Sequence, residues 1–63
     1  MSIDEHLRKI VDERGIKQIF IVKKTGLHLR TISSILNGKR RIQADEFLNI
    51  CASLDINPNE LIN

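Results

Sequence analysis

Hydrophobic positions near the start of the chain repeat with the period of an α-helix. In SIDEHLRKIVDERG, four apolar residues fall at i, i+4, i+7 and i+8: Ile3, Leu7, Ile10 and Val11. This spacing places them on one face of an amphipathic helix. Ser2 and Glu5 have the spacing of a capping box at its start. Gly15 is expected to end it, because glycine adopts the left-handed cap conformation at low cost.

The next segment, KQIFIVKKTG, combines a helical context with residues that favour strands. In isolation the run Ile19 to Val22 is typical of a β-strand. A single strand among helices would have no partner for its backbone hydrogen bonds. We therefore expect a helix from about Lys17 to Lys24 that stops at Gly26.

Three further helices are predicted after Gly26. LHLRTISSILNG is expected to place Leu27, Ile32 and Ile35 inward and to end at Gly38. In ADEFLNICASLD, four residues are expected to share the inward face: Phe47, Leu48, Cys51 and Leu54. The last segment, NPNELI, has Asn57 as N-cap, Pro58 at the first helical position and Glu60 completing a second capping box. The pattern predicts one compact all-α domain of five helices over residues 1–63.

Composition fits a small soluble domain. With 63 residues the core must be small, so oligomerisation would add stability. The chain is 41% hydrophobic and 29% charged, which is too apolar for a disordered segment. The longest apolar run, Ile19 to Val22, is far too short for a membrane span, and the polar N-terminus is unlike a secretory signal. One cysteine, Cys51, cannot form an internal disulfide, which favours a reducing cytoplasm.

Charge is unevenly distributed along the chain. Eight of the ten cations, and no acid, lie from Arg14 to Ala44, whereas the rest of the chain has two cations and eight acids and so a net charge of −6. A separation of this kind attracts a polyanion to one side of a molecule whose net charge is only +2. A solvated basic face without a partner would have the same composition. The spatial arrangement of the helices is therefore needed to distinguish a polyanion-binding surface from a solvated one.

The second and third predicted helices supply that geometry. Both are short, and about three residues centred on Gly26 connect them, which is the helix-turn-helix arrangement. In this motif the second helix enters the major groove with its N-terminal residues at the base edges, while the first crosses the backbone. Here that N-terminal turn is His28 to Thr31. An acid in it would meet phosphate at close range, which gives a physical reason for the missing carboxylates.

From Leu7 to Ile62 the chain resembles the phage-repressor-like (Cro/C1-type, or XRE-type) helix-turn-helix domains. The resembling features are Gln18 at the start of the second helix, Gly26 in the turn, TIS at 31–33, NGKR at 37–40 and the closing LDINPNEL. None of these is specific alone, but their order and spacing are. The resemblance implies a lambda-repressor-like five-helix DNA-binding fold, in agreement with the five segments, with the recognition helix at about 28–36.

The resemblance also implies contacts with double-stranded DNA. Base-reading side chains would be His28, Leu29, Arg30 and Ser34. Backbone contacts would come from Lys17, Gln18, Thr31, Ser33, Asn37, Lys39, Arg40 and Arg41. Arg30 suits guanine O6 and N7, although a solvated arginine near phosphates is an alternative. Thr31 can instead support the start of its helix. The trio 39–41 can serve the helix dipole, but three cations exceed that need, so we expect them to clamp phosphates without competing acids.

Four positions depart from the family pattern. His28 stands where a serine-like N-cap is usual, so either the helix starts elsewhere or His28 is kept for contact. Leu29, at a commonly polar position, can touch a thymine methyl or fold back into the core. Ile19 and Phe20 also replace polar residues. They indicate either a surface covered by another molecule or local packing against the first or third helix.

The implied function is a sequence-specific transcriptional regulator, a repressor acting as a homodimer in the cytoplasm of a bacterium or encoded by a phage. Dimer contacts would use Phe47, Leu61 and Ile62, with the last two partly uncovered near the terminus, or Ile19 and Phe20. The alternative is an antitoxin or antirepressor-like module that binds a protein partner through Ile19, Phe20 and Leu29.

Other function classes find little support in the sequence. There is no pair of catalytic carboxylates, no nucleophile with a base and no phosphate-cradling loop, so we do not expect an enzyme or a cofactor. His6, His28 and Cys51 lack the spacing of metal ligands, and Cys51 is expected to be a small core residue. RNA binding is disfavoured by the lack of exposed stacking aromatics.

Overall fold

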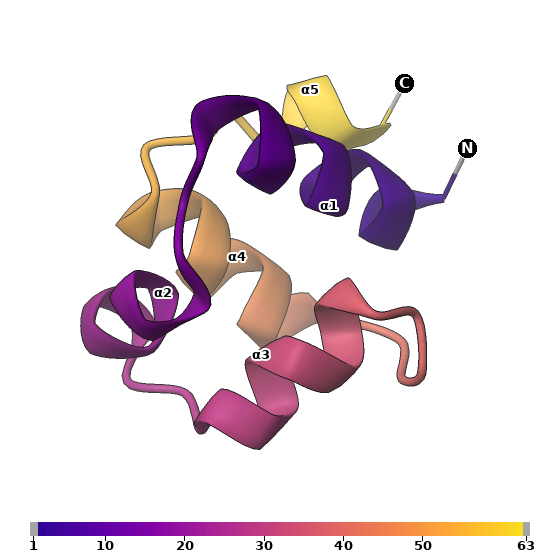
Figure 1. Cartoon of the computed structure of the whole chain (residues 1–63). Helices are drawn as coiled ribbons and strands as arrows, with labels where there is room; N and C mark the ends of the chain where they lie inside the picture. Colours follow the sequence, from indigo (N-terminus) through magenta and orange to yellow (C-terminus); the bar gives the residue numbers. More distant parts are fainter. Residues whose placement is uncertain (1, 63) are drawn as a thin grey trace.

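The computed structural model describes residues 2–62, without the side chain of Ile62, and these residues fold into helices with no strand among them (Figure 1). The helices are α1 (Ile3–Arg14), α2 (Gln18–Thr25), α3 (Leu29–Leu36), α4 (Ala44–Ser53) and α5 (Asn59–Ile62). All five predicted helices are confirmed to within two residues, including the β-prone α2. None of the helices in this part of the chain is long and apolar enough to cross a membrane.

Side chains cap the starts of the first and the last helix. The Glu5 backbone N–H donates to Ser2 Oγ (3.2 Å), as predicted, and the Ser2 hydroxyl donates to the Glu5 carboxylate (3.2 Å). Asn57 also caps as expected, because its Oδ1 accepts the Asn59 N–H (3.0 Å). Its reciprocal bond from Glu60 is not found within residues 2–62. A glutamate instead reaches back at the start of α4, where the Gln43 N–H donates to Glu46 (3.0 Å).

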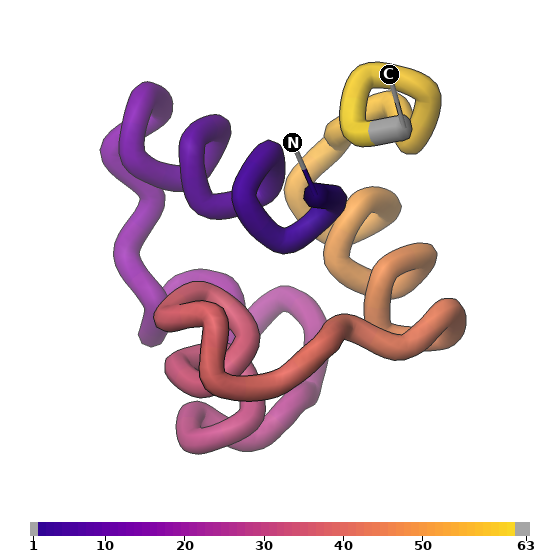
Figure 2. Tube along the Cα trace, turned by 90° about the vertical axis from the view of Figure 1, so that its right-hand side faces the viewer, coloured from indigo at the N-terminus to yellow at the C-terminus, as the bar shows by residue number. Residues whose placement is uncertain are grey.

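The core collects one apolar face from each helix. α2 packs on α3 and α4, and α1 packs on α3 and α5 (Figure 2). The buried apolar residues are Leu7, Val11, Ile21, Ile32, Ile35, Leu36, Ile50, Cys51, Leu54, Ile56 and Leu61. Cys51 is therefore confirmed as a core residue, and burial raises the pKa of its thiol. Because these faces meet inside the bundle, the outer sides of α2 and α3 remain on the surface.

Two residues are placed differently from the sequence prediction. Leu48 is 59% exposed rather than inward. The inward stripe of α4 passes through Phe47, Ile50, Cys51 and Leu54, and a residue one position after Phe47 is turned by about 100° away from it. Leu61 is only 1% exposed, so its predicted place on an uncovered dimer surface is wrong.

The burial of Leu61 follows from the position of α5. This short helix lies alongside α1, and the His6 side chain donates through Nδ1 to the Leu61 carbonyl (3.0 Å). The apolar side chain is thereby placed inside the bundle. The side chain of Ile62, the neighbouring candidate, lies outside the described residues. Phe47, the third candidate, is half-buried and packs against the core.

Helix α4 holds the turn between α2 and α3. Gly26 adopts the left-handed conformation (φ 76°), and its N–H donates to the Val22 carbonyl (2.9 Å). From α4, the Asn49 amide donates to the Thr25 carbonyl (2.9 Å) and the Ser53 hydroxyl donates to the Lys24 carbonyl (3.2 Å). The last two carbonyl groups of α2 are thus bonded by α4, which fixes the end of α2 where the turn to α3 begins.

Candidate nucleic-acid interface

The start of α3 is defined by a histidine cap. His28 is the N-cap residue, and the Arg30 backbone N–H donates to His28 Nδ1 (3.2 Å). The helix therefore begins where the sequence suggested, and histidine replaces the usual serine-like residue in that role. A ring nitrogen that accepts a hydrogen bond carries no proton, so in the neutral ring the proton is on Nε2. The exposed Nε2–H is then a donor at the first turn of α3.

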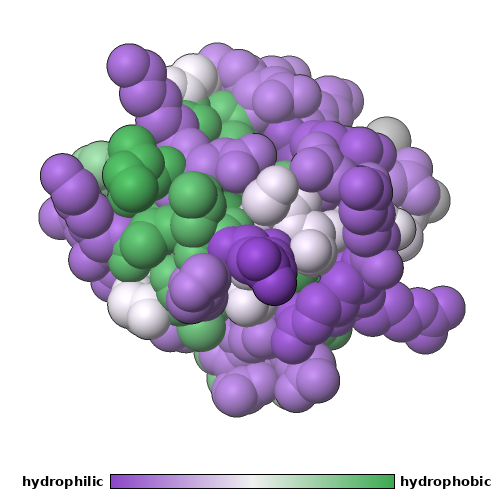
Figure 3. Space-filling view, turned by 60° about the horizontal axis from the view of Figure 1, so that its bottom comes forward, coloured by the Kyte–Doolittle hydropathy of each residue, from purple (hydrophilic) through white to green (hydrophobic). Residues whose placement is uncertain are grey.

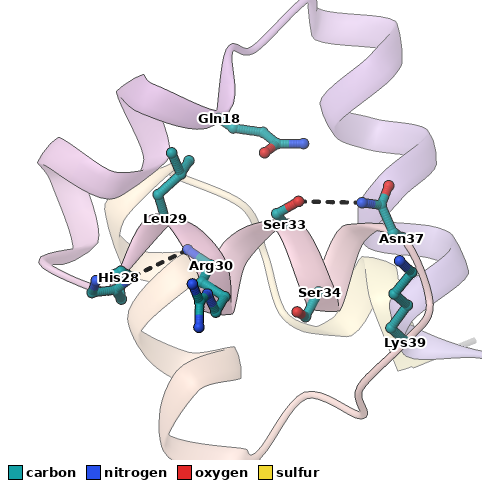
Figure 4. Close-up of a pocket in the computed structure, with 8 residues that line it drawn as sticks. All are labelled: Gln18, His28, Leu29, Arg30, Ser33, Ser34, Asn37 and Lys39. Carbon is teal, nitrogen blue, oxygen red and sulfur yellow. Dashed lines mark hydrogen bonds between the residues drawn. The ribbon is translucent and has the colours of Figure 1, made fainter.

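A shallow hollow of about 440 Å³ lies along the outer face of α3 and reaches the start of α2. We call it the α3 hollow. Figure 4 shows its lining side chains, which come from α2, α3 and the loop after α3: Gln18, His28, Leu29, Arg30, Ser33, Ser34, Asn37 and Lys39. All four predicted base-reading residues are therefore brought together, with four of the eight predicted backbone-contacting residues.

Within the α3 hollow, hydrogen-bond donors and acceptors lie next to one apolar side chain, that of Leu29. The Asn37 amide donates to Ser33 Oγ (3.2 Å), which leaves the Ser33 hydroxyl proton available as a donor (Figure 4). Leu29 is 46% exposed on the same face, so the alternative in which it joins the core is wrong. No carboxylate belongs to this lining in the part of the chain that the structure describes. The surface suits a partner with anionic and hydrogen-bonding groups.

The N-terminus of α2 borders this surface. Lys17, its N-cap residue, makes no side-chain capping bond, and the first turn has no acid. The first backbone N–H groups of a helix have no partner within the helix and carry partial positive charge. Such an end favours an anion, and Gln18 lies beside it.

At the other end of α3 the chain turns sharply. Gly38 has φ 73°, its N–H donates to the Ile35 carbonyl (3.2 Å), and the Lys39 N–H donates to the Ser34 carbonyl (2.9 Å). This pair of bonds is a Schellman motif, which ends the helix and reverses the chain. Lys39 consequently stays at the edge of the α3 hollow, whereas the following residues leave it.

Arg40 does not face this hollow as a free cation. Its guanidinium donates two hydrogen bonds to the two carboxylate oxygens of Glu46 (2.8 and 2.7 Å). This bonding raises the pKa of Arg40 and, against the opposing effect of burial, holds the pKa of Glu46 below its usual value. The expectation that the trio 39–41 has no competing acid is therefore wrong for Arg40. Glu46 lies outside the acid-free stretch, and the chain reversal brings it there.

Three other predicted contact residues lie off the α3 hollow. Arg41 is exposed and borders a hollow at the start of α1 together with Asp4, whose carboxylate accepts the Ile42 N–H (3.4 Å). Thr31 is half-buried beside the inward face of α3. Lys17 borders a separate hollow next to the connection between α1 and α2.

The role of Glu46 in organising this region was not predicted from the sequence. It is buried, accepts bonds from Arg40 and from the Gln43 backbone, and so ties the loop after α3 to the start of α4. A signal was present in QADE at 43–46, where a polar residue precedes a glutamate by three positions before an apolar run.

An apolar area lies next to the polar face. Figure 3, which brings the side of α2 and α3 forward, shows apolar side chains gathered beside hydrophilic ones. Ile19 and Phe20 on α2 are 51% and 45% exposed. About half of each side chain is therefore left uncovered by the rest of the domain, so local packing accounts for only part of this apolar area.

Comparison with known proteins agrees with the geometry. The model of the Cro/C1-type HTH DNA-binding domain matches residues 6–63. Searches among curated proteins and among solved structures found no match. The family match covers α1 from His6 onward and α2 to α5 in full, and it includes every residue of the α3 hollow. The chain thus belongs to the family of Cro/C1-type helix-turn-helix DNA-binding domains.

Proposed function

We propose that this domain recognises a specific sequence in double-stranded DNA by placing α3 in the major groove, and that it represses transcription from the bound site. The observation that carries the proposal is the α3 hollow, in which His28, Leu29, Arg30 and Ser34 line one acid-free face. The major groove presents a distinct pattern of donors, acceptors and methyl groups for each base pair, and these side chains can match it.

Each base-reading residue has a chemical role. The guanidinium of Arg30 fits the two acceptors of guanine, O6 and N7. The exposed Leu29 side chain suits the methyl group of thymine. The Nε2–H of His28 and the hydroxyl of Ser34 can donate to base acceptors at either side of Arg30. Because His28 also caps α3, its ring is held in a defined orientation at the entry to the groove.

Backbone contacts would flank α3 on two sides. The free amide groups of α2, with Lys17 and Gln18, are suited to one phosphate group, because a helix N-terminus favours an anion. Beyond the other end of α3, Lys39 and the Asn37 amide are suited to a second phosphate group. Ser33 can bond to base or phosphate. The paired Arg40 is not part of this proposed clamp, and Arg41 and Thr31 are proposed only as peripheral contacts.

We further propose that the active form is a homodimer in a bacterial cytoplasm, with the gene carried by a bacterium or a phage. Helix α3 has eight residues, about 12 Å of helix, and reads only a few base pairs, which is too little to specify a site in a genome. Two copies related by a two-fold axis would read inverted half-sites about 10 base pairs apart, centre to centre. Phe47 and Ile62 remain candidates for the contact between the copies.

Selection of bound sites from random duplex DNA tests this proposal. We expect enrichment of an inverted repeat, together with tight binding that weakens steeply with salt because phosphate contacts release counterions. Light scattering of the protein on the enriched duplex gives the number of copies bound. Recovery of random sequences would contradict specific recognition, and one copy on an asymmetric site would contradict the dimer.

A further inference from the structure

A second hollow, of about 420 Å³, lies beside the connection between α1 and α2, and we call it the α1–α2 hollow. Its apolar part is formed by Ile16, Ile19 and Phe20. Around these lie three cations, Arg14, Lys17 and Lys23. The combination differs from that of the α3 hollow, whose lining is mostly polar.

Two contacts hold this surface in shape. The Arg14 guanidinium donates to the Leu54 carbonyl at the end of α4 (3.3 Å), which fixes the cation beside the junction. The Lys24 ammonium lies over the Phe20 ring, 5.5 Å from its centroid, and so favours one orientation of the ring. A surface that is already ordered loses less conformational entropy when a partner binds.

The charge of the rim is not neutralised within the domain. No carboxylate lines the α1–α2 hollow among the described residues, and across residues 2–62 the one ion pair is Arg40 with Glu46. A ligand that offers carboxylates at the rim and an apolar group at the centre would therefore satisfy both parts of the surface.

We propose that the α1–α2 hollow binds an acidic segment of a partner protein, which inserts one large apolar side chain between Ile19 and Phe20 and places its carboxylates against Lys17 and Lys23. Double-stranded DNA is a poorer match, because its bases are stacked inside the duplex and its phosphate and sugar groups gain nothing from an apolar floor. A second copy of this chain is also a poorer match. A two-fold contact of this surface with itself would bring the cations of the two rims together, and like charges repel.

The position of the hollow couples partner binding to DNA binding, and this consequence rests on the proposed function. Lys17 is the N-cap of α2 and directly precedes Gln18, which lines the α3 hollow. Carboxylates held at Lys17 would repel the phosphate expected at the start of α2. The bound segment should therefore weaken DNA binding, and by linkage DNA should weaken binding of the segment by the same factor.

Binding of synthetic peptides to the full chain, without DNA, tests the proposal. The probe is a fluorescein-labelled amphipathic peptide with leucine and phenylalanine on one face and glutamates beside them. We expect saturable binding by anisotropy, with amide chemical-shift changes confined to residues 14–24. Two control peptides, one with the glutamates replaced by glutamines and one with the apolar face replaced by alanines, should each bind at least about tenfold more weakly.

Matched variants locate the contact. Ile19→Asp and Phe20→Asp change exposed positions and should abolish peptide binding while circular dichroism remains unchanged. Leu48→Asp should retain peptide binding, because Leu48 is an exposed leucine on α4 that does not line the hollow. If Phe20→Asp does not fold, Lys17→Glu with Lys23→Glu tests the rim instead.

Three results would overturn the inference: no shift at saturating peptide, shifts confined to α3, or self-association of the free protein that disappears in Phe20→Asp. Loss of DNA binding on addition of the peptide tests only the coupling. If peptide binding is confirmed while no DNA site is ever enriched, the proposed function fails and the partner site stands.

Discussion

Lys39 and Arg40 are adjacent cations with opposite surroundings, and replacing each by alanine should separate DNA contact from structural support. Lys39 is exposed at the edge of the α3 hollow. Arg40 is engaged by both oxygens of Glu46. We expect Lys39→Ala to remove one phosphate contact and to reduce the slope of log K against log salt by about 0.9. Arg40→Ala should leave that slope nearly unchanged.

The size of the effect can be worked out for a convenient salt range. Between about 50 and 200 mM salt, log concentration changes by about 0.6, so a slope difference of about 0.9 changes the affinity ratio of wild type to variant by about 3.5-fold. The affinity lost in Lys39→Ala should shrink by this factor at the higher salt. Arg40→Ala should instead lower the thermal unfolding temperature, because it leaves the buried Glu46 carboxylate without its partner.

Fluorescence anisotropy on the selected DNA site, repeated over a salt series, measures both slopes. Lys9→Ala is the matched control, since Lys9 is an exposed cation on α1 that lines none of the hollows described above. It reports the effect of net charge alone. Equal slopes for Lys39→Ala and Arg40→Ala would refute the division of roles, as would a Lys9→Ala effect as large as that of Lys39→Ala.

Four further outcomes are expected. Arg30→Ala should cost about 1–3 kcal/mol on the preferred site, relax one base position and affect random DNA less, which competition binding can check. Wild type should lose stability more steeply than Glu46→Gln as pH falls below about 4.3, measured by denaturant unfolding. The reason is that a carboxylate whose folded pKa is lowered stabilises the fold above its unfolded pKa and loses this contribution as pH falls through the folded value. Leu61→Ala should lower the free energy of unfolding by about 2–5 kcal/mol, because Leu61 is buried; an unchanged denaturation midpoint would contradict this. Asp55→Gly should raise the free energy of unfolding by about 0.5–1 kcal/mol, because Asp55 has φ 55° and glycine adopts this left-handed conformation with less strain. A lower denaturation midpoint for Asp55→Gly would contradict this reason.

Local patterns in the sequence were sufficient to predict the helices, and the family resemblance pointed to the residues that line the α3 hollow. The apolar period of 3.6 residues and the cap residues act within a few positions, so they are visible in the chain itself. The residues of the α3 hollow lie on one short helix and the two segments that flank it, so their spacing in the sequence is close to their spacing on the surface.

Two of the errors concern contacts that are set by the path of the chain between helices rather than by helix periodicity. Whether Arg40 is free depends on the path of the loop to Glu46, and whether Leu61 is covered depends on α5 packing along α1. Neither follows from local spacing. Leu48 shows a different limit, since a shift of one position on a helix decides between core and solvent.

The bonds from Asn49 and Ser53 on α4 to the carbonyls at the end of α2 join segments that are 24 and 29 residues apart in the chain. Because these bonds join α4 to the end of α2 beside the turn, we expect α2, the turn, α3 and α4 to open as one cooperative unit. Amide hydrogen exchange in this unit should therefore occur through a shared opening rather than by independent fraying of the turn. A fragment limited to α2 and α3 would lack these bonds, so the proposed recognition helix depends on α4 residues that do not line the α3 hollow.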